Sequence, residues 1–368
     1  MQKIVKLLDT VFEFQADKED VLDYIDYFMD SYGEIGNKIE EKNLVKVQVA
    51  AGNVPEHLEN SETVKVHTTK HPYWNFSGEY TEKQEGRTVL WPTRNILITL
   101  DSSATNIAVI YCAKEKAVFV GEAIFHMMRG IALYKRDNTN ANFLHASGVI
   151  VNQKGFLFTG AVSAGKTTLL LEGIAKYGAT PLTNDRIFLK CDEDEVRGYS
   201  WPSYASFCEG TILQYPGLTE GANTYQKDEN YKYRTIDFPG ELKEAYDKGS
   251  KRIYPMMFMC DWLSTKFVNS SKIHTVFISK LDINAEKMKI KELSKDEDYD
   301  FIYQSLESQL FDSREPSFMP WHGLKLRDGC TPVGELIDKF YETDCKIVEV
   351  VLSPEHIEDF MEYIKINY

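Results

Sequence analysis

The sequence predicts an α/β fold built on a mixed (α+β) sheet, and three observations support this prediction. Short apolar strands recur in both halves of the chain, separated by turn residues. A strand, a glycine-containing loop and an amphipathic helix follow one another directly over residues 156–177. The last clear strand, Lys346–Leu352, is followed by a predicted helix over 354–364. Strands and helices that alternate in this way are typical of α/β architectures.

A chain of 368 residues exceeds the usual size of one domain, so we expect two. We assign residues 1–140 to a smaller N-terminal α+β region of unknown role, mostly β, and residues 141–368 to a second domain. The N-terminal region is predicted to hold helices at 17–32 and 125–135 and strands at 64–67, 87–93, 95–100 and 106–112.

The second domain has the stronger pattern. We expect a hairpin of strands at 148–151 and 156–158, a helix at 167–177 that stops at Gly178, and strands at 180–182, 187–189 and 275–278. The segment 286–297 looks like a charged, solvated helix. The Tyr- and Lys-rich segment 225–233 looks like an exposed loop, which leaves open that it holds a peptide.

Composition narrows the class of protein. Apolar residues make up 43% of the chain, which supports a packed core, and the net charge of −14 disfavours nucleic-acid binding. The scattered cysteines, with no C-x-x-C pair, favour buried thiols in a reducing compartment; they are Cys112, Cys191, Cys208, Cys260, Cys330 and Cys345. No signal peptide is recognisable, and the most apolar run, 117–134, is interrupted by Glu122 and Arg129. We therefore expect a soluble cytoplasmic protein with no membrane or nucleic-acid partner, and leave a homo-oligomer open.

A phosphate-binding motif stands between the second strand of the hairpin and the following helix. Residues 160–167 satisfy G-x-x-x-x-G-K-[ST], whose backbone N–H groups surround nucleotide phosphates. Lys166 is then expected to contact the β- and γ-phosphates and Thr167 to bind Mg²⁺, so the predicted cofactors are ATP and Mg²⁺. The nucleotide-binding residues are predicted to be Gly160, Ala161, Val162, Ser163, Ala164, Gly165, Lys166, Thr167 and Thr168.

Three further residues flank this motif. Asp185 follows Lys166 by one helix and one short strand, a position suited to a second Mg²⁺ ligand, although a structural turn is the alternative. Asn184 is neutral, so it can orient a substrate or a metal-bound water but cannot act as a base. His145 precedes the hairpin and is a candidate proton shuttle or anion donor, with a structural role as the alternative.

The order His145-Ala-Ser-Gly, hairpin, phosphate loop, helix and Asn184-Asp185 resembles the catalytic domain of HPr kinase/phosphorylase. It is also similar to the wider group of HPr-kinase-like proteins related in fold to PEP carboxykinase. The resemblance covers 143–190 well and continues more loosely to 218. It implies that His145 lies near the transferred phosphate, and that Asn184 and Asp185 occupy the positions of an Asp pair that shares metal binding and deprotonation of an acceptor serine.

The sequence departs from the family pattern at two places. Asn184 replaces the first acid of the pair, which leaves open whether Asp185 alone is both ligand and base. Val162-Ser163 stands where the family usually has Ser-Gly. No segment associated with the phosphorylase reaction is recognisable, so the reverse activity is not predicted.

These residues predict an ATP-dependent kinase that phosphorylates a hydroxyl, namely a serine of a protein or peptide. Catalytic roles are expected for His145, Lys166, Asn184 and Asp185, and metal binding for Thr167 and Asp185. A small-molecule hydroxyl kinase, and a nucleotide-binding regulatory protein with weak or no transferase activity, are the alternatives. Arg186, Arg234 and Arg252 are candidate cations for the transition state, with ion-pair or surface roles as the alternative.

Overall fold

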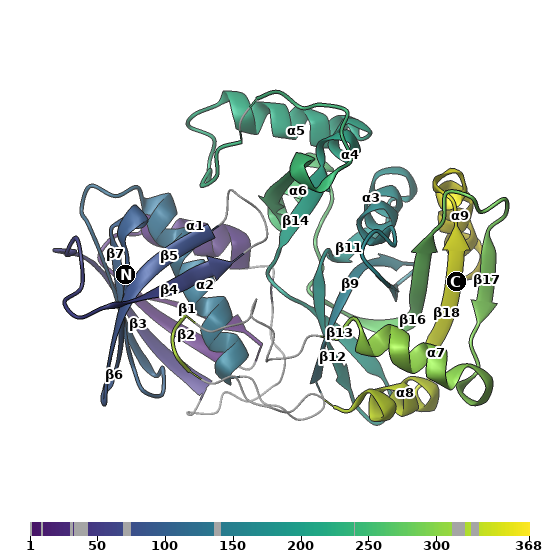
Figure 1. The fold of residues 1–368 in the computed structure, drawn as a ribbon, viewed down its shortest axis with the longest axis horizontal. Coiled ribbons are helices and arrows are strands. Elements are labelled where there is room, and N and C mark those ends of the chain that lie inside the picture. The colour runs from purple at the N-terminus through teal and green to yellow at the C-terminus, as the bar shows by residue number, and fades with distance from the viewer. Residues whose placement is uncertain are drawn as a thin grey trace. The chain divides into compact units, whose positions relative to one another are not determined.

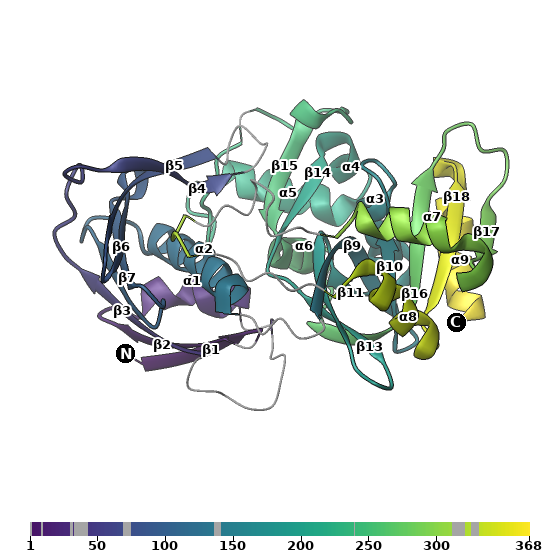
Figure 2. The ribbon, with the colours of Figure 1, turned by 60° about the horizontal axis from the view of Figure 1, so that its bottom comes forward.

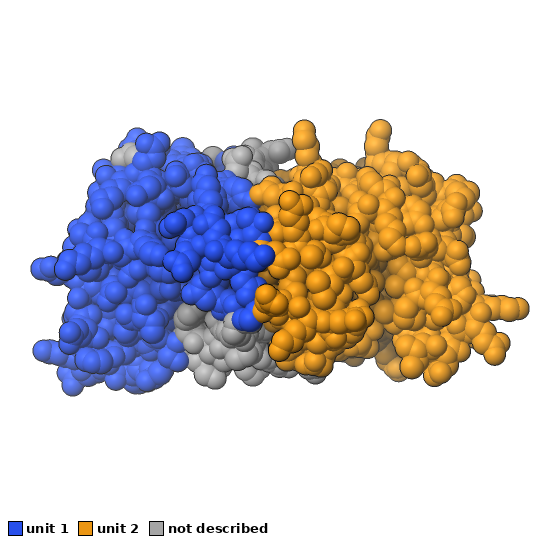
Figure 3. Space-filling view, turned by 90° about the horizontal axis from the view of Figure 1, so that it is seen from above, with its two compact units in different colours: residues 1–137, 224–240, 313–328 blue, residues 138–223, 241–312, 329–368 orange. Residues whose placement is uncertain are grey.

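The computed structural model of this chain describes residues 2–8, 10–29, 32, 43–68, 75–135, 141–238, 240–310, 321–324 and 331–368. The chain divides into two compact units, shown in separate colours in Figure 3. Unit 1 comprises residues 1–137, 224–240 and 313–328, and unit 2 comprises residues 138–223, 241–312 and 329–368. Each unit contains its own sheet and its own helices, so the fold is mixed α/β.

Unit 1 is built on an eight-stranded sheet in the order β1-β2-β3-β8-β7-β6-β5-β4 (Figure 1). β3 lies parallel to both of its neighbours, and the other pairs are antiparallel. The strands are β1 (Gln2–Leu7), β2 (Thr10–Ala16), β3 (Leu44–Ala51), β4 (Glu62–Thr68), β5 (Asn75–Lys83), β6 (Gly86–Trp91), β7 (Ile96–Asp101) and β8 (Asn106–Tyr111).

Two helices, α1 (Asp20–Met29) and α2 (Ala117–Lys135), contact each other and cover one face of this sheet (Figures 1 and 2). Buried and exposed residues alternate along the strands accordingly. In β3, Val45 and Val47 are buried whereas Lys46 between them is exposed. An antiparallel or mixed sheet with one packed face has this period of two, so the opposite face of the unit 1 sheet is polar.

Helix α2 is longer than the helix predicted at 125–135, because Glu122 does not interrupt it. By length and composition alone it could span a membrane, with a mean hydropathy of 1.3, but 61% of that stretch is buried inside the protein. No other helix in the described parts of the chain meets these criteria. A core helix has the same composition, and the contacts of α2 with α1, β1 and β2 are those of a core helix.

The strands predicted for this unit are present with shifted ends. The strand predicted at 87–93 ends at Trp91, because Pro92 lacks an N–H to donate and begins the short 3₁₀ turn η3 (Pro92–Arg94). The strands β1, β2 and β3 were not predicted at all. The segment 225–233 is not simply an exposed loop: Tyr225 lies in the last turns of a helix and is buried, and its hydroxyl donates to the carbonyl of Ile236 at 2.7 Å.

Unit 2 contains a second mixed sheet in the order β10-β9-β12-β13-β16-β18-β17. β11 also pairs with β9, and β10 pairs in parallel with β16. The strands are β9 (Ala141–Val151), β10 (Lys154–Thr159), β11 (Thr180–Thr183), β12 (Arg186–Cys191), β13 (Val196–Ser200), β16 (Ser270–Leu281), β17 (Lys289–Glu292) and β18 (Lys346–Leu352), and a separate hairpin is formed by β14 (Tyr204–Cys208) and β15 (Lys251–Pro255).

Helices cover both faces of this sheet (Figure 1). Leu157 of β10 joins a buried apolar cluster with Ile302 and Phe340 of two of these helices. The neighbouring Phe158 points to the opposite face and packs edge-on against Phe360, with ring centroids 6.2 Å apart. The helices of unit 2 are α3 (Lys166–Tyr177), α4 (Glu209–Leu213), α5 (Pro216–Lys227, which continues into unit 1), α6 (Met256–Trp262), α7 (Lys295–Glu307), α8 (Val333–Glu342) and α9 (Ile357–Asn367).

The prediction of a helix at 286–297 is wrong. Residues Lys289–Glu292 form the edge strand β17, which pairs with β18, and α7 begins only at Lys295. The charged side chains are compatible with either element, because an edge strand of a sheet is often rich in lysine. Five cysteines are free thiols, namely Cys112, Cys191, Cys208, Cys260 and Cys345, and Cys330 lies outside the described residues.

Candidate functional site

The motif residues form a tight loop between β10 and α3 in unit 2. Three of them have positive φ angles: Gly160 (141°), Ser163 (69°) and Gly165 (84°). A Cβ at Gly160 would lie 2.4 Å from the carbonyl oxygen of Ser279, and one at Gly165 would lie 2.7 Å from Leu281. Both glycines are therefore required by conformation and by space. The predicted succession of strand, loop and helix is present, and α3 presents its N-terminal end to this loop.

Lys166 is folded back onto the loop. Its ammonium group donates to the carbonyl oxygens of Gly160 at 2.7 Å and Ala161 at 3.0 Å, and only 9% of the residue is exposed. Burial lowers the pKa of Lys166; the negative charge of Asp185 opposes this effect and the positive charge of Lys251 adds to it. The other end of the same residue is also held, since the hydroxyl of Ser147 donates to the Lys166 carbonyl at 2.5 Å.

Strand register brings His145 and Asp185 to the same end of the sheet as the loop. Arg186 at the start of β12 pairs with His145 of β9, while Ala146 next to it pairs with Thr159, the last residue of β10. The backbone N–H of Ala146 also donates to the Asp185 carbonyl at 3.1 Å. The loop begins directly after Thr159, so these residues share one edge of unit 2.

The carboxylate of Asp185 has two cationic or potentially cationic partners. Its Oδ1 lies 3.3 Å from Nε2 of His145, and its Oδ2 lies 3.1 Å from Nε of Arg186. Burial alone would raise the pKa of Asp185, but the hydrogen bond from His145 and the charges of Arg186 and Lys166 lower it to about 2. Asp185 is therefore a carboxylate at every physiological pH.

Asn184 is buried beside this pair. Only 6% of the residue is exposed, and its side-chain oxygen Oδ1 has no hydrogen-bond partner among the described residues. The preceding residue is satisfied, since the hydroxyl of Thr183 donates to the carbonyl of Arg186 at 2.6 Å. A buried acceptor without a donor costs free energy, so this oxygen is a feature that requires an explanation.

Two other predicted cations have structural partners. Arg234 belongs to unit 1, pairs with Asp237 at 2.7 Å and donates to the backbone carbonyl of Tyr225. Arg252 is 1% exposed and pairs with Glu209 at 2.8 Å. Both therefore have the ion-pair role given above as the alternative. Arg186 is the predicted arginine that contacts the site, through Asp185.

The oxygen atoms at this edge are of the kinds that bind a hard cation such as Mg²⁺. They are the hydroxyl of Thr167, the carboxylate of Asp185 and the unpartnered oxygen of Asn184. The described residues contain no group of three or more His, Cys, Asp or Glu side chains that could hold a metal without other ligands.

The role of Ser147 was missed by the sequence analysis, although this residue is the serine of the His145-Ala-Ser-Gly order. Its hydroxyl donates to the Lys166 carbonyl, and this contact is one that the sequence pattern does not reveal.

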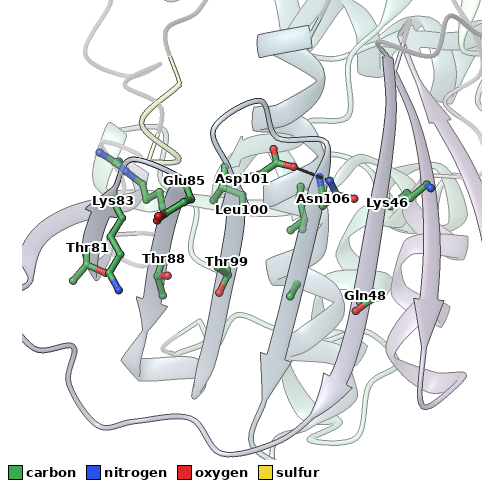
Figure 4. A pocket seen from close by; sticks show the side chains of 14 residues that line it. Lys46, Gln48, Thr81, Lys83, Glu85, Thr88, Thr99, Leu100, Asp101 and Asn106 are labelled. Atoms are coloured by element: carbon green, nitrogen blue, oxygen red, sulfur yellow. Dashed lines mark hydrogen bonds between the residues drawn. The ribbon is translucent and has the colours of Figure 1, made fainter.

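A hollow of about 530 Å³ lies elsewhere, on the polar face of the unit 1 sheet (Figure 4). Short polar side chains such as Thr88 and Thr99 line it, with Lys46 and Lys83 from flanking strands. The one carboxylate of the β7–β8 turn, Asp101, is already saturated by hydrogen bonds from Ser103, Thr105 and Asn106. This hollow is an open surface with no reactive arrangement, so the candidate site remains at the loop of unit 2.

No protein-family model and no curated protein matches this chain. Among solved structures, the chain is similar to the Hpr(Ser) kinase/phosphatase from Coxiella burnetii. The identity is 12%, the match covers 61% of this chain and 94% of that chain, and the TM-score is 0.25.

Proposed function

We propose that this chain is an ATP-dependent phosphotransferase of the HPr-kinase-like type that phosphorylates a hydroxyl, namely a serine of a cytoplasmic protein or peptide. Residues 141–368, apart from the segments 224–240 and 313–328 that belong to unit 1, would form its catalytic domain, with a PEP-carboxykinase-like phosphate-loop core. One observation carries the proposal: Lys166 and the His145–Asp185 pair lie at the same edge of one sheet, beside the loop that follows β10.

The nucleotide half of the proposal rests on residues 160–168. The backbone N–H groups of the loop and the N-terminal end of α3 would surround the phosphates, and Lys166 would leave its loop carbonyls to neutralise the β- and γ-phosphates. Thr167 and Asp185 would hold Mg²⁺, which supplies further neutralisation of phosphate charge when bound. Positioning and charge neutralisation are the main contributions that a protein makes to this reaction.

The acceptor half rests on His145, Asp185 and Asn184. The hydroxyl oxygen of the acceptor forms a bond to the γ-phosphorus, and the bond from this phosphorus to the β–γ bridging oxygen breaks, so ADP leaves with the electron pair. The hydroxyl proton passes to the His145–Asp185 pair. Asn184 cannot take a proton, and its unpartnered oxygen would accept a hydrogen bond from another donor of the acceptor molecule, such as a backbone N–H, and so hold the acceptor in place.

The test is transfer of labelled phosphate from ATP to proteins and peptides of a lysate, with mass spectrometry to locate the modified residue. Lys166→Met removes the charge at nearly constant volume and should abolish transfer, while Lys272→Met removes an exposed lysine of β16 and should not. Thermal unfolding of both variants checks that they are folded. Full transfer by Lys166→Met would overturn the proposal.

A second candidate is a nucleotide-binding regulatory protein with weak transferase activity. Two observations favour it: Asn184 is neutral, and the Asp185 carboxylate is already paired with His145 and Arg186. Asn184→Asp separates the two candidates. A large gain in transfer identifies the native chain as a weakened catalyst, whereas reduced transfer favours the kinase in which Asn184 is a working residue, and unchanged transfer assigns Asn184 no part in the reaction.

A further inference from the structure

Two buried hydroxyl groups connect the phosphate loop to strand β9. The hydroxyl of Thr159, the last residue of β10, donates to the carbonyl of His145 at 3.0 Å. The hydroxyl of Ser147 donates to the carbonyl of Lys166 at 2.5 Å. Both side chains are buried. The first bond lies directly before the loop and the second lies where α3 begins, so both ends of the loop are attached to β9.

Strand geometry relates these two bonds to the side chain of His145. Side chains two residues apart on a strand point to the same face, about 7 Å from each other. His145 and Ser147 therefore share one face of β9, and α3, which packs against β9, is attached there through the Lys166 carbonyl. Thr159 is attached to the backbone of His145 itself. The separation between the His145 imidazole and the loop lysine thus depends on bonds that involve neither of these two side chains.

Thr159 is also held by the strand on its other side. Its carbonyl accepts a hydrogen bond from the hydroxyl of Ser279 in β16 at 3.1 Å, and Ser279 is buried. The Ser279 carbonyl lies so near Gly160 that a Cβ on this glycine would be 2.4 Å from it. β10 pairs in parallel with β16 over this stretch. A shift of the start of the loop would therefore break hydrogen bonds to both neighbouring strands.

We propose that Ser147 and Thr159 are positioning residues whose hydroxyls fix the phosphate loop relative to the His145–Asp185 pair. The inference rests on the proposed function, because it assumes that the transferred phosphate lies between the loop and this pair. Phosphoryl transfer needs the attacking and leaving oxygens roughly in line, and a misplacement of about 1 Å can lower the rate about a hundredfold. Each hydroxyl acts through the backbone carbonyl of another residue.

The test measures the maximal rate of phosphate transfer from labelled ATP, with Mg²⁺, to the proteins of a lysate, and the ATP concentration that gives half this rate. Thr159→Val removes one hydroxyl at nearly constant volume, and Ser147→Ala removes the other. Each should lower the maximal rate about tenfold or more and change the half-saturating ATP concentration by less than about threefold, because alignment is lost while the loop and its lysine remain. Thr159→Ser keeps the hydroxyl and should restore most of the rate.

Two matched controls remove buried hydroxyls of unit 2 at positions outside the loop and its flanking residues. Thr343→Val removes a hydroxyl that donates to the Lys339 carbonyl at 2.7 Å, and Ser271→Ala removes one that donates to the Lys272 carbonyl at 3.0 Å. These variants should lower the thermal unfolding midpoint about as much as Thr159→Val and Ser147→Ala do, since each loses one buried hydrogen bond. Their rate of transfer should stay that of the native chain.

The outcomes distinguish this inference from the proposed function. If Thr159→Val or Ser147→Ala transfers phosphate at the native rate, the inference is wrong for that residue and the proposed function stands. If Thr343→Val loses as much rate as Thr159→Val, or if Thr159→Ser is as slow as Thr159→Val, the hydroxyl has no positioning role and the inference is wrong. If the native chain transfers no phosphate, or if Lys166→Met transfers it at the full rate, the proposed function fails and the inference fails with it.

Discussion

The imidazole Nε2 of His145 lies 3.3 Å from the carboxylate Oδ1 of Asp185, across the antiparallel pairing of β9 and β12. The pairing depends on register: a shift of β12 by one residue would turn Asp185 or its neighbours to the other face of the sheet. The two side chains are half-exposed at the edge where the phosphate loop begins. This geometry supports the proposed role of His145 as a proton acceptor, because the neighbouring carboxylate orients the imidazole and favours its protonated form.

Replacing His145 tests this pair. His145→Gln should lower kcat for phosphoryl transfer by about a hundredfold or more, with a much smaller change in ATP affinity, since the pair handles the acceptor proton. The same change lets the pKa of Asp185 rise from about 2, because its hydrogen bond from His145 is lost. Steady-state kinetics give both parameters. His57→Gln, at an exposed histidine of unit 1, is the control, and an unchanged kcat in His145→Gln would exclude the role of this histidine.

Asn184→Leu separates stability from function. The substitution removes a buried oxygen that lacks a donor, so the free energy of unfolding should rise by about 1 kcal/mol, provided that the leucine fits. Phosphoryl transfer should fall at the same time, because the acceptor molecule loses a group that holds it in place. Urea denaturation and the transfer assay measure the two effects on the same preparation. Higher stability with full activity would mean that Asn184 has no part in the reaction.

Gly165→Ala tests the conformation of the loop. The φ of 84° and the Leu281 side chain at 2.7 Å from an added Cβ together make alanine costly here, so nucleotide binding should be lost. Gly178 is the matched control: it has a φ of 65° with nothing within 4 Å, so Gly178→Ala should cost only about 1 kcal/mol of backbone strain and leave binding intact. Isothermal titration with Mg²⁺ and ATP gives the binding result. Equal affinities for the two variants would show that the loop does not need this glycine.

Glu122 of unit 1 makes stability depend on pH. It is fully buried, and burial raises its pKa to about 7 although Arg94 lies 3.3 Å away and opposes the shift. The folded state therefore holds this proton more tightly than the unfolded state, and the contribution of Glu122 to stability is complete below about pH 4.5 and is lost as the pH rises through 7.

Glu122→Gln should remove this dependence. The variant keeps a neutral side chain, so at pH 8 it should be more stable than the native chain by up to about 3 kcal/mol, with a smaller difference at pH 5. Chemical denaturation at several pH values measures it. Glu59→Gln, at an exposed loop position, should show no such trend. A constant difference between Glu122→Gln and the native chain from pH 5 to 8 would contradict the assignment.

The sequence was most informative where local pattern and tertiary structure agree. The strand, loop and helix around residues 154–177 could be predicted because glycines, apolar alternation and the Gly178 stop all act over a few residues. The edge strand β17 could not, because its charged residues pair with β18, about sixty residues later. The burial of Tyr225 could not be predicted for a similar reason, since the Ile236 carbonyl that accepts a hydrogen bond from its hydroxyl lies beyond the segment 225–233.

The residues of the candidate site also differ in how far the sequence alone can predict them. His145, Lys166 and Asp185 stand close together in the sequence, and their proximity in space follows from one hairpin and one crossover. Ser147 is connected to the site by the hydrogen bond from its hydroxyl to the Lys166 carbonyl, which is not visible in a single sequence. The unpartnered oxygen of Asn184 is likewise a property of packing, which residue type alone does not reveal.

The two hydrogen bonds from Lys166 to the carbonyls of its own loop have a kinetic consequence. The Lys166 ammonium that an incoming anion would contact is already hydrogen-bonded to two loop carbonyls. These hydrogen bonds must break before the ammonium can bind the anion. Association then includes a unimolecular step, and its observed rate levels off as ligand concentration increases instead of rising without limit. A loop that binds the proposed ligand in this way would also set the maximum rate at which binding occurs.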